Sequence, residues 1–397
     1  MPGMAGALRE RSEFGQGRAA FLPQLGGAAL QVGKALQRLP PDRAAGEEAM
    51  GPRRVGVLHH AHELRRRHAG GEHHRIDTAI AELGYIPDAA ARALSSRRTR
   101  TIGAIIPTVD NAMFARGVEA LQSYLSLQGY LLLLSTSGYD PEVEARQAQN
   151  MVSRGIDGLI LRGDMHTDSL RRLLASQRIP FVNVGVYHPD KPYACVGNNN
   201  EAAAWRACRY LMELGHRKIG MVAAISSNND RATARAAGVR RALADDGLQL
   251  RPEWHLEVPY HLDDARQAAR TLLSLPDWPT AVVCGNDVIA YGVMLEVERR
   301  GLRVPDDLSV MGFDDLEWSR HLRPSLTTMH VPTDEVWTRA GEFLVRSLSG
   351  RPAPLHHEVD VSLVVRESTG RPGRTPGPGA REALARNGPT DAGASRR

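Results

Sequence analysis

Cysteine is scarce in this sequence, with only Cys195, Cys208 and Cys284 among 397 residues. An odd number without CxxC spacing argues against a disulfide framework or a zinc site and is typical of a reducing compartment. Long apolar runs are also absent, since GYLLLL at residues 129–134 is far too short to span a bilayer. The N-terminal segment has charges of both signs and lacks the continuous apolar core of a secretory signal. We therefore expect a cytoplasmic protein.

The residue sets on which most enzymes depend are absent too. There is no Ser/His/Asp set, no pair of acid/base carboxylates and no phosphate loop, and VGNNN and GFDD lack the glycine spacing of a nucleotide cradle. Six histidines fall between His59 and His74, but their spacing follows no metal-ligand pattern. We therefore predict no catalysis, no metal and no other cofactor.

The net charge of +5 conceals an uneven distribution along the chain. Residues 1–100 hold 16 Lys and Arg against 10 Asp and Glu, and residues 371–397 hold 6 against 2. The body between these ends is therefore mildly acidic. Basic ends permit a polyanionic partner such as nucleic acid, although solvated basic tails would give the same composition.

From Thr101 onward, short apolar strands alternate with helical patterns that end at glycine. Strand-like runs such as TIGAIIP, YLLLLST and DGLILRG are separated by segments of helical spacing, and a second series of the same kind begins at Glu201. This alternation predicts an α/β fold with two doubly wound parallel sheets, in two lobes of about 130 residues each. Ligands of such sheets lie beyond the carboxyl ends of the strands.

Polar side chains follow two consecutive strands of the second series. Asn286 and Asp287 end the run AVVCGND, and Asp314 ends the core of SVMGFDD. An amide and carboxylates at neighbouring strand ends suit the hydroxyl groups of a sugar or nucleoside, because buried polar groups require hydrogen-bonding partners. The sequence therefore predicts a small-molecule pocket at this edge.

Several motifs then follow one another in a recognisable order: RIDTAIAELGYIPDAAARAL, TIGAIIPTVDNAMF, GIDGLIL, LMELGHRKIGMVA, AVVCGNDVIAYGVM, GLRVPDDLSVMGFDD and VSLVVREST. Together, from about Arg75 to Gly370, they resemble the LacI/GalR family of bacterial transcription repressors. The resemblance implies a small helix-turn-helix head, a hinge helix and a two-lobed core like that of periplasmic binding proteins. It also implies operator DNA, a small effector and a homodimer as partners.

The resemblance adds residues to the predicted effector pocket. Arg235 matches the family's ligand-contacting arginine, which faces the carboxylates across the cleft, and Tyr260 falls where an aromatic side chain stacks on the ligand ring. Asn111 and Phe114 match the wall that the N-lobe contributes. From its position alone, Asn111 could equally cap a helix.

The segment before the first strand matches the family's hinge helix. It is too short to be a stable helix alone, but such a helix can fold in the DNA minor groove with an apolar side chain wedged between base pairs. The resemblance assigns the opening of the helix to Pro87, the wedge to Leu94, and phosphate contacts to Arg92, Arg97 and Arg98. An interdomain linker with incidental arginines is the alternative.

The resemblance breaks down before Arg75. Residues 75–85 match the third helix of the head, but residues 1–74 contain no V-S-x-x-T-V-S run and no pair of amphipathic helices. We interpret this stretch as irregular, either disordered or out of the family's reading frame, with a divergent head as the alternative. The predicted division is 1–74 irregular, 75–100 head remnant and hinge, 101–185 with 330–355 N-lobe, 186–329 with 356–370 C-lobe, and 371–397 disordered tail.

The prediction from sequence is thus a LacI-type repressor, homodimeric and controlled by a small effector, which we expect to be a sugar. Two other hypotheses stay open. A head-less cytosolic subunit would share every core residue and differ only before Arg75. A sugar-binding transport component would need a signal peptide and no hinge, whereas the sequence shows the opposite.

Overall fold

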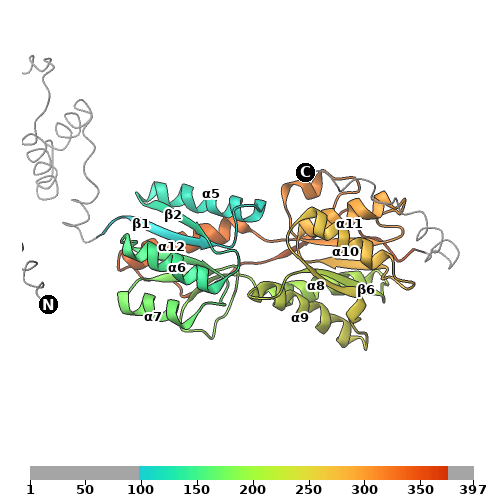
Figure 1. Ribbon diagram of the computed structural model, residues 1–397, viewed down its shortest axis with the longest axis horizontal. Coiled ribbons are helices and arrows are strands. Elements are labelled where there is room, and N and C mark those ends of the chain that lie inside the picture. The colour runs from blue at the N-terminus through green and yellow to red at the C-terminus, as the bar shows by residue number, and fades with distance from the viewer. Residues whose placement is uncertain (1–97, 374–397) are drawn as a thin grey trace, which may run out of the picture. The chain divides into compact units, whose positions relative to one another are not determined.

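The computed structural model describes residues 98–373, all of which belong to one compact unit. The predicted α/β architecture with two parallel-sheet lobes is confirmed (Figure 1). The predictions for residues 1–97 and for the tail after residue 373 lie outside the described residues. Among them are four of the five hinge residues: Pro87, Arg92, Leu94 and Arg97.

The N-lobe is a six-stranded parallel sheet with helices on both faces, in the strand order β11-β5-β4-β3-β1-β2. Its strands are β1 (Thr101–Ile106), β2 (Leu131–Thr136), β3 (Gly158–Arg162), β4 (Phe181–Val184), β5 (Ala194–Gly197) and β11 (His356–Glu358). One face is covered by α5 (Ala112–Leu127) and α12 (Thr333–Leu348), and the other by α6 (Pro141–Ser153) and α7 (Asp168–Gln177).

The C-lobe repeats this plan with the strand order β12-β10-β9-β8-β6-β7, in which only β12 runs antiparallel to its neighbour. Its strands are β6 (Ile219–Ala224), β7 (His255–Val258), β8 (Ala281–Cys284), β9 (Ser309–Asp314), β10 (Thr327–His330) and β12 (Ser362–Val364). Helices α8 (Asn200–Glu213) and α9 (Asp230–Asp245) pack on one face, and α10 (Leu262–Leu273) and α11 (Asp287–Arg299) on the other. Two 3-10 turns, η1 (Pro252–Trp254) and η2 (Glu317–Arg320), complete it.

The structure corrects the predicted lobe boundaries. Strand β5 pairs with β4, and β11 pairs with β5, so both belong to the N-lobe although 186–329 and 356–370 were assigned to the C-lobe. The chain therefore crosses between the lobes three times: after β5, after β10 and after β11. Strands of three or four residues carry too little periodicity to be assigned to a sheet from sequence.

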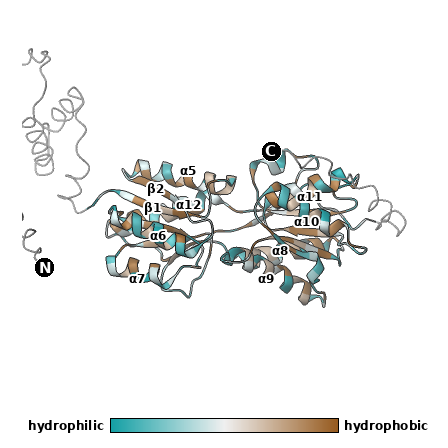
Figure 2. Ribbon diagram, viewed as in Figure 1, coloured by the Kyte–Doolittle hydropathy of each residue, from teal (hydrophilic) through white to brown (hydrophobic). Residues whose placement is uncertain are grey.

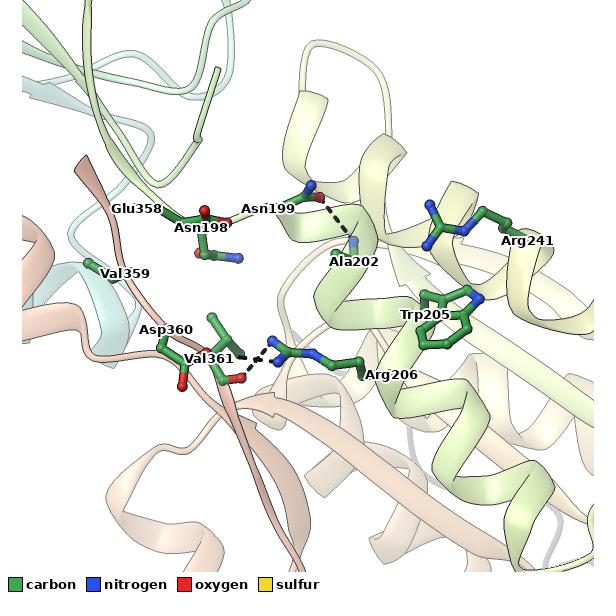
Figure 3. A pocket seen from close by; sticks show the side chains of 10 residues that line it. All are labelled: Asn198, Asn199, Ala202, Trp205, Arg206, Arg241, Glu358, Val359, Asp360 and Val361. Carbon is green, nitrogen blue, oxygen red and sulfur yellow. Dashed lines mark hydrogen bonds and ion pairs between the residues drawn. The ribbon is translucent and has the colours of Figure 1, made fainter. Parts of the chain in front are cut away.

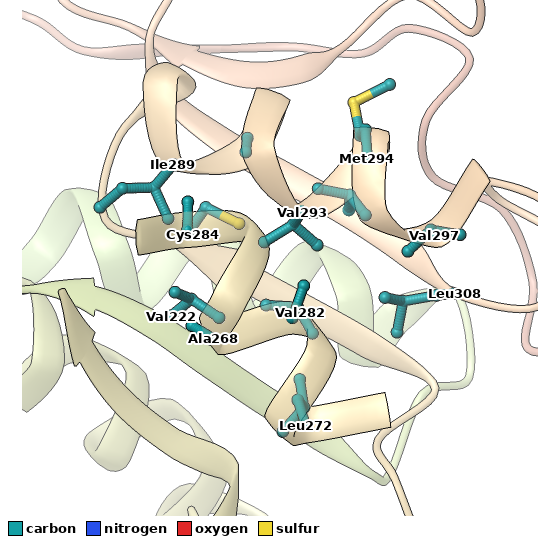
Figure 4. Packing of buried hydrophobic residues seen from close by; sticks show 14 of the residues in the cluster. Val222, Ala268, Leu272, Val282, Cys284, Ile289, Val293, Met294, Val297 and Leu308 are labelled. Carbon is teal, nitrogen blue, oxygen red and sulfur yellow. The ribbon is translucent and has the colours of Figure 1, made fainter. Parts of the chain in front are cut away.

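Both sheets are covered on two faces, which explains why their strands are continuously apolar rather than alternating. In β1, the run TIGAII has only its first residue partly exposed. In the C-lobe, Val222, Val282 and Cys284 of the sheet pack against Ile289 and Val293 of α11 (Figure 4). Figure 2 shows the same layering, with hydrophobic strands between helices that carry their hydrophilic residues outward.

Helices begin soon after strands end, and most begin at a side chain that accepts a backbone N–H of the first turn. These N-caps are Asn111, Asp140, Thr167, Asn199, Asn229 and Asn286. In a strand-to-helix unit, this places the helix N-termini at the carboxyl edge of the sheet. Because the chain leaves β5 and β10 from that edge to enter the other lobe, the carboxyl edges of the two sheets face each other.

Gly238 generates a stability prediction, because α8 and α9 pack so closely there. A Cβ at this position would lie 2.2 Å from the carbonyl oxygen of Glu201 and 2.9 Å from the amide nitrogen of Trp205, both backbone atoms of α8. We expect Gly238→Ala to lower the free energy of unfolding by about 1–3 kcal/mol, because the helices must separate. The intrinsic helix preference for alanine, about 1 kcal/mol, has the opposite sign.

Urea denaturation measures this difference, and Gly341→Ala in α12 is the matched control. At Gly341 a Cβ would meet only side-chain atoms, of Tyr124 at 2.9 Å and Leu121 at 3.0 Å, which can shift. A smaller loss is expected for the control. Equal losses of free energy of unfolding in the two variants, or a more stable Gly238→Ala protein, would contradict this account of helix packing.

Candidate functional site

A narrow cavity lies where the two carboxyl edges face each other, with about 320 Å³ of non-atom space when open solvent is included. Such edges are where α/β sheets bind ligands. Both lobes and the crossovers between them line it: Met113, Arg162, Gly185, Thr333, Val336 and Trp337 from the N-lobe, Asn200, Arg235, Phe313 and Asp314 from the C-lobe, and Asn198 and Val331 from the crossovers. A second narrow cavity, also with about 320 Å³ of non-atom space including open solvent, is lined by Tyr139, Asn228 and Arg231 among others and shares Arg162 with the first.

Asp314 and Arg235, both predicted from sequence, lie together in the first cavity. Oδ1 of Asp314 is 3.9 Å from Nη1 of Arg235, and both side chains are less than a tenth exposed. The Arg235 guanidinium also lies over the Phe313 ring, 4.5 Å from its centroid. Burial raises the pKa of Asp314 to about 6, against the opposing effects of Arg235 and Arg162. The backbone of Asp314 has φ 108°, a strained conformation typical of functional sites.

Asn286 and Asp287 do not line the cavity, contrary to the prediction. The Asp287 carboxylate is fully buried and accepts three hydrogen bonds within the C-lobe, from Leu316 N (2.6 Å), Ser319 Oγ (2.7 Å) and Thr328 Oγ1 (2.6 Å). Burial, followed by repulsion from Asp314, raises its pKa to about 7. Asn286 caps α11 by accepting from Ile289 N at 2.9 Å. A strand end that starts a helix turns its first side chains toward the helix rather than into the cavity.

Asn111 and Phe114 are also placed behind the cavity wall. Asn111 caps α5, accepting from Met113 N at 3.0 Å, so the helix-cap alternative describes its contact. Phe114 is almost completely buried in the N-lobe core. Met113, between them, is the residue of this segment that lines the cavity.

Tyr260 lies at a contact between the lobes. Its ring stacks on that of Tyr139, which follows β2 in the N-lobe, with 6.2 Å between centroids. Two hydrogen bonds also join the lobes. The backbone amide of Asp164 donates to Asp230 Oδ2 at 2.7 Å, and Asn200 Nδ2 donates to the Gly185 carbonyl at 2.9 Å. The lobes are therefore closed on one another around the cavity.

Arg162 is the residue that the sequence analysis missed. It ends β3, lines both cavities and lies over the Phe114 ring at 5.6 Å. Burial, followed by repulsion from Arg231, lowers its pKa to about 10. A signal was present, because an arginine that ends the apolar run DGLIL at the carboxyl edge is unusual in a buried strand.

A larger hollow, of about 970 Å³ including open solvent, lies against the crossovers (Figure 3). Its basic groups already have protein partners. Arg206 donates to the Val361 carbonyl at 2.7 Å, and Arg241 donates to Glu201 at 2.7 Å. The hollow is open and its charges are paired, so the smaller cavity between the lobes is the better candidate for a specific ligand.

Arg98, the one described hinge residue, is exposed and donates from Nη2 to the Leu348 carbonyl at the end of α12 (2.5 Å). The next two backbone amides, of Thr99 and Arg100, donate to the two carboxylate oxygens of Asp157 at 3.0 and 2.8 Å. The segment that enters β1 is therefore tied to the N-lobe at both α12 and the turn before β3.

Two features of residues 98–373 bear on other functions. In that range, no three His, Cys, Asp or Glu side chains gather as a metal ion would require. None of the helices described there is long and apolar enough to cross a membrane.

Fold and cavity together define a two-lobed ligand-binding core of the periplasmic-binding-protein type. A family model for a periplasmic binding protein-like domain matches residues 208–369. The HTH-type transcriptional repressor PurR of Aliivibrio salmonicida is 32% identical over 288 residues, which cover 72% of this chain and 84% of that protein. PurR of Vibrio vulnificus is 32% identical over 298 residues, covering 74% and 88%.

Solved structures give the same result. The transcription regulator GntR from Chromobacterium violaceum has a TM-score of 0.64 at 27% identity, over 68% of this chain and 99% of that one. A LacI family regulator from Silicibacter pomeroyi has a TM-score of 0.62 at 29% identity, over 68% and 98%. The chain belongs to the LacI/GalR family of transcriptional regulators. Its relatives are DNA-binding repressors, a class distinct from enzymes.

The raised pKa of Asp314 predicts a pH dependence of stability. Its folded pKa, about 6, exceeds the ordinary 3.8, so its contribution to stability is present below pH 3.8 and is lost as pH rises through 6. Asp314→Asn mimics the protonated form. Relative to the wild type, we expect the free energy of unfolding of the variant to rise by on the order of 2–3 kcal/mol when the pH is raised from about 4 to about 7.5. Urea unfolding of both proteins at the two pH values measures this gain, and parallel profiles would show that Asp314 ionises freely in the fold.

Proposed function

We propose that the protein represses transcription by binding operator DNA as a homodimer, and that a small polar effector held between the lobes controls this binding. The carrying observation is the buried Arg235–Asp314 pair, which lies at the edge of the C-lobe sheet and opens into the cavity between the lobes. Buried charges of this kind are uncommon unless a partner or ligand satisfies them.

The cavity is suited to a molecule of the sugar type. The Asp314 carboxylate accepts hydrogen bonds from hydroxyl groups and the Arg235 guanidinium donates them. Asn198 adds an amide whose Nδ2 is buried without an acceptor. Phe313 and Trp337 provide apolar surface for the carbon skeleton. Structural relatives support this class, since they include a CelR–cellobiose complex (27% identity, TM-score 0.61) and a putative ribose operon repressor from Burkholderia thailandensis (26%, 0.59).

Control would act through the relative position of the lobes. An effector that contacts both lobes favours the closed arrangement, in which Tyr139 stacks on Tyr260 and Asp164 is bonded to Asp230. The segment leading from the DNA-binding region is fixed to the N-lobe through Asp157. A change in how the N-lobes of a dimer meet would therefore change the spacing of the two hinge segments, and with it the affinity for a two-part operator.

The test is an operator-binding experiment with the full-length protein. Upstream DNA fragments bound by the protein are selected, and the dissociation constant of one is measured with and without a panel of monosaccharides and disaccharides. Asp314→Ala and Arg235→Ala should each weaken the effector by on the order of 1–3 kcal/mol, because a buried hydrogen bond to a charged group is lost. Arg339→Gln, on the solvent-exposed side of α12, is the control and should keep the full response to the effector. An effector response that survives in both cavity variants would place the effector elsewhere.

The DNA contact has its own test at Leu94. We expect Leu94→Ala to weaken specific operator binding while leaving non-specific binding to calf-thymus DNA nearly unchanged, because a wedge acts only where the duplex is bent. Affinity should fall steeply with salt in both proteins, as phosphate contacts require. A head-less ligand-binding subunit, the alternative hypothesis, would bind no operator in either form.

A further inference from the structure

One guanidinium in the cavity, that of Arg162, forms no ion pair within 4 Å among residues 98–373. Nε of Arg162 is enclosed without a hydrogen-bond acceptor. The one acceptor near its Nη2 is the Met113 sulfur, at 3.9 Å, and the Phe114 ring lies beneath the guanidinium. Part of the side chain stays accessible, and it lines both cavities between the lobes. The guanidinium is therefore directed at the space where a ligand would lie.

The nearby carboxylates are engaged with other groups. Asp230 binds Nη1 of Arg231 at 2.7 Å, and Asp314 faces Arg235. Glu144 is bonded to His166 Nδ1 at 2.6 Å. Asp140 caps α6 by accepting from two backbone amides. Arg231 and Arg235 therefore each have a carboxylate within 4 Å, whereas none of the described carboxylates lies within 4 Å of Arg162.

The backbone accommodates this arginine at a cost. Gly185, which has φ 78°, faces the guanidinium so closely that a Cβ would lie 1.5 Å from Nη1 of Arg162. A buried charge without a partner is among the most unfavourable features of a folded protein. Glutamine or methionine would fill this space without that cost, so packing alone does not account for an arginine.

We infer that the effector is an anion whose carboxylate or phosphate group binds Arg162, which makes it a sugar acid or a sugar phosphate rather than a neutral sugar. The inference rests on the proposed effector site and specifies its chemistry. A guanidinium is planar and binds either group through two parallel hydrogen bonds. Arg235 and Asp314 remain available for the hydroxyl groups.

The first experiment uses the simplest probes, inorganic phosphate and acetate, on the full-length protein. Their affinities are measured by calorimetry. The ionic strength is kept constant by replacing chloride with the probe anion. Wild type should bind at least one of them, and Arg162→Gln should bind it at least tenfold more weakly, because a charge-assisted hydrogen bond is lost. Arg162→Lys should retain part of the affinity. If Arg162→Gln does not fold, the affinity of Arg162→Lys is compared with that of the wild type instead. Arg339→Gln, a charge change on the solvent-exposed side of α12, should bind the anions as tightly as the wild type.

The second experiment separates the two sources of negative charge and tests the site itself. Thermal unfolding of wild type and Arg162→Gln is followed with glucose, gluconate and glucose 6-phosphate, and with the corresponding galactose and ribose series. Stabilisation by the acid identifies a carboxylate, and stabilisation by the phosphate ester identifies a phosphate, provided that Arg162→Gln weakens the effect. If only the neutral sugars stabilise the protein, the inference of an anionic effector is wrong, while the proposed sugar-binding site between the lobes is retained. Equal responses of wild type and Arg162→Gln to every anion, including no response, would also overturn it. The response of Asp314→Ala to the neutral sugars then tests the proposed effector site separately. A lost response supports the site, and an unchanged response contradicts it.

Discussion

The hydrogen bonds of the Asp287 carboxylate hold together the edge of the C-lobe on which the candidate site depends. This group joins the first turn of α11 to the backbone of Leu316, to Ser319 in η2 and to Thr328 in β10. The loop that leaves β9 is therefore fixed at Leu316, two residues after Asp314. A strained backbone at Asp314 persists only where the surroundings hold it in place, and Asp287 provides that restraint. The cavity-lining carboxylate of Asp314 and the structural carboxylate of Asp287 thus act as a pair, the second orienting the first.

The cavity between the lobes is arranged for binding rather than for stability. Asp314 is buried with its pKa raised, Arg162 is mostly enclosed with its pKa lowered, and Asn198 keeps a buried amide nitrogen without an acceptor. By contrast, the buried Glu296 of α11 is surrounded by Arg266, Arg270, Arg299 and Arg300 and forms an internal network. The chain can thus neutralise buried charge where no ligand is expected. The unbalanced charges are concentrated where the lobes meet, as expected if a ligand completes them.

The sequence predicted the architecture because its strongest signals are local. Strands such as TIGAII and helices with glycine-terminated ends are long enough to show their period, and the family motifs fixed their order. Strand β11 was placed in the wrong lobe because its pairing joins residues more than 150 positions apart, such as Cys195 and His356. Strand β5 pairs with the nearby β4, but its four residues carry too little periodicity to be assigned from sequence. Of the predicted effector-binding residues, Arg235 and Asp314 line the cavity, and their contact with an effector stays a prediction. Asn286, Asp287 and Asn111 were wrongly placed there, because proximity to a strand end does not reveal whether a side chain caps a helix or faces the ligand. Arg162 was overlooked because a single arginine after an apolar run has no spacing to compare.

The three crossings of the chain have a consequence for synthesis on the ribosome. Helix α12, which contributes the buried Trp337 and Leu344 to the N-lobe core, and the edge strand β11 both follow the whole of the C-lobe sheet except β12. The N-lobe therefore cannot complete its core until about residue 358 has emerged, long after the first strands have left the exit tunnel. Until then β1 to β5 expose the apolar face that α12 later covers. Both lobes reach their native form almost together, once β11 and β12 have emerged.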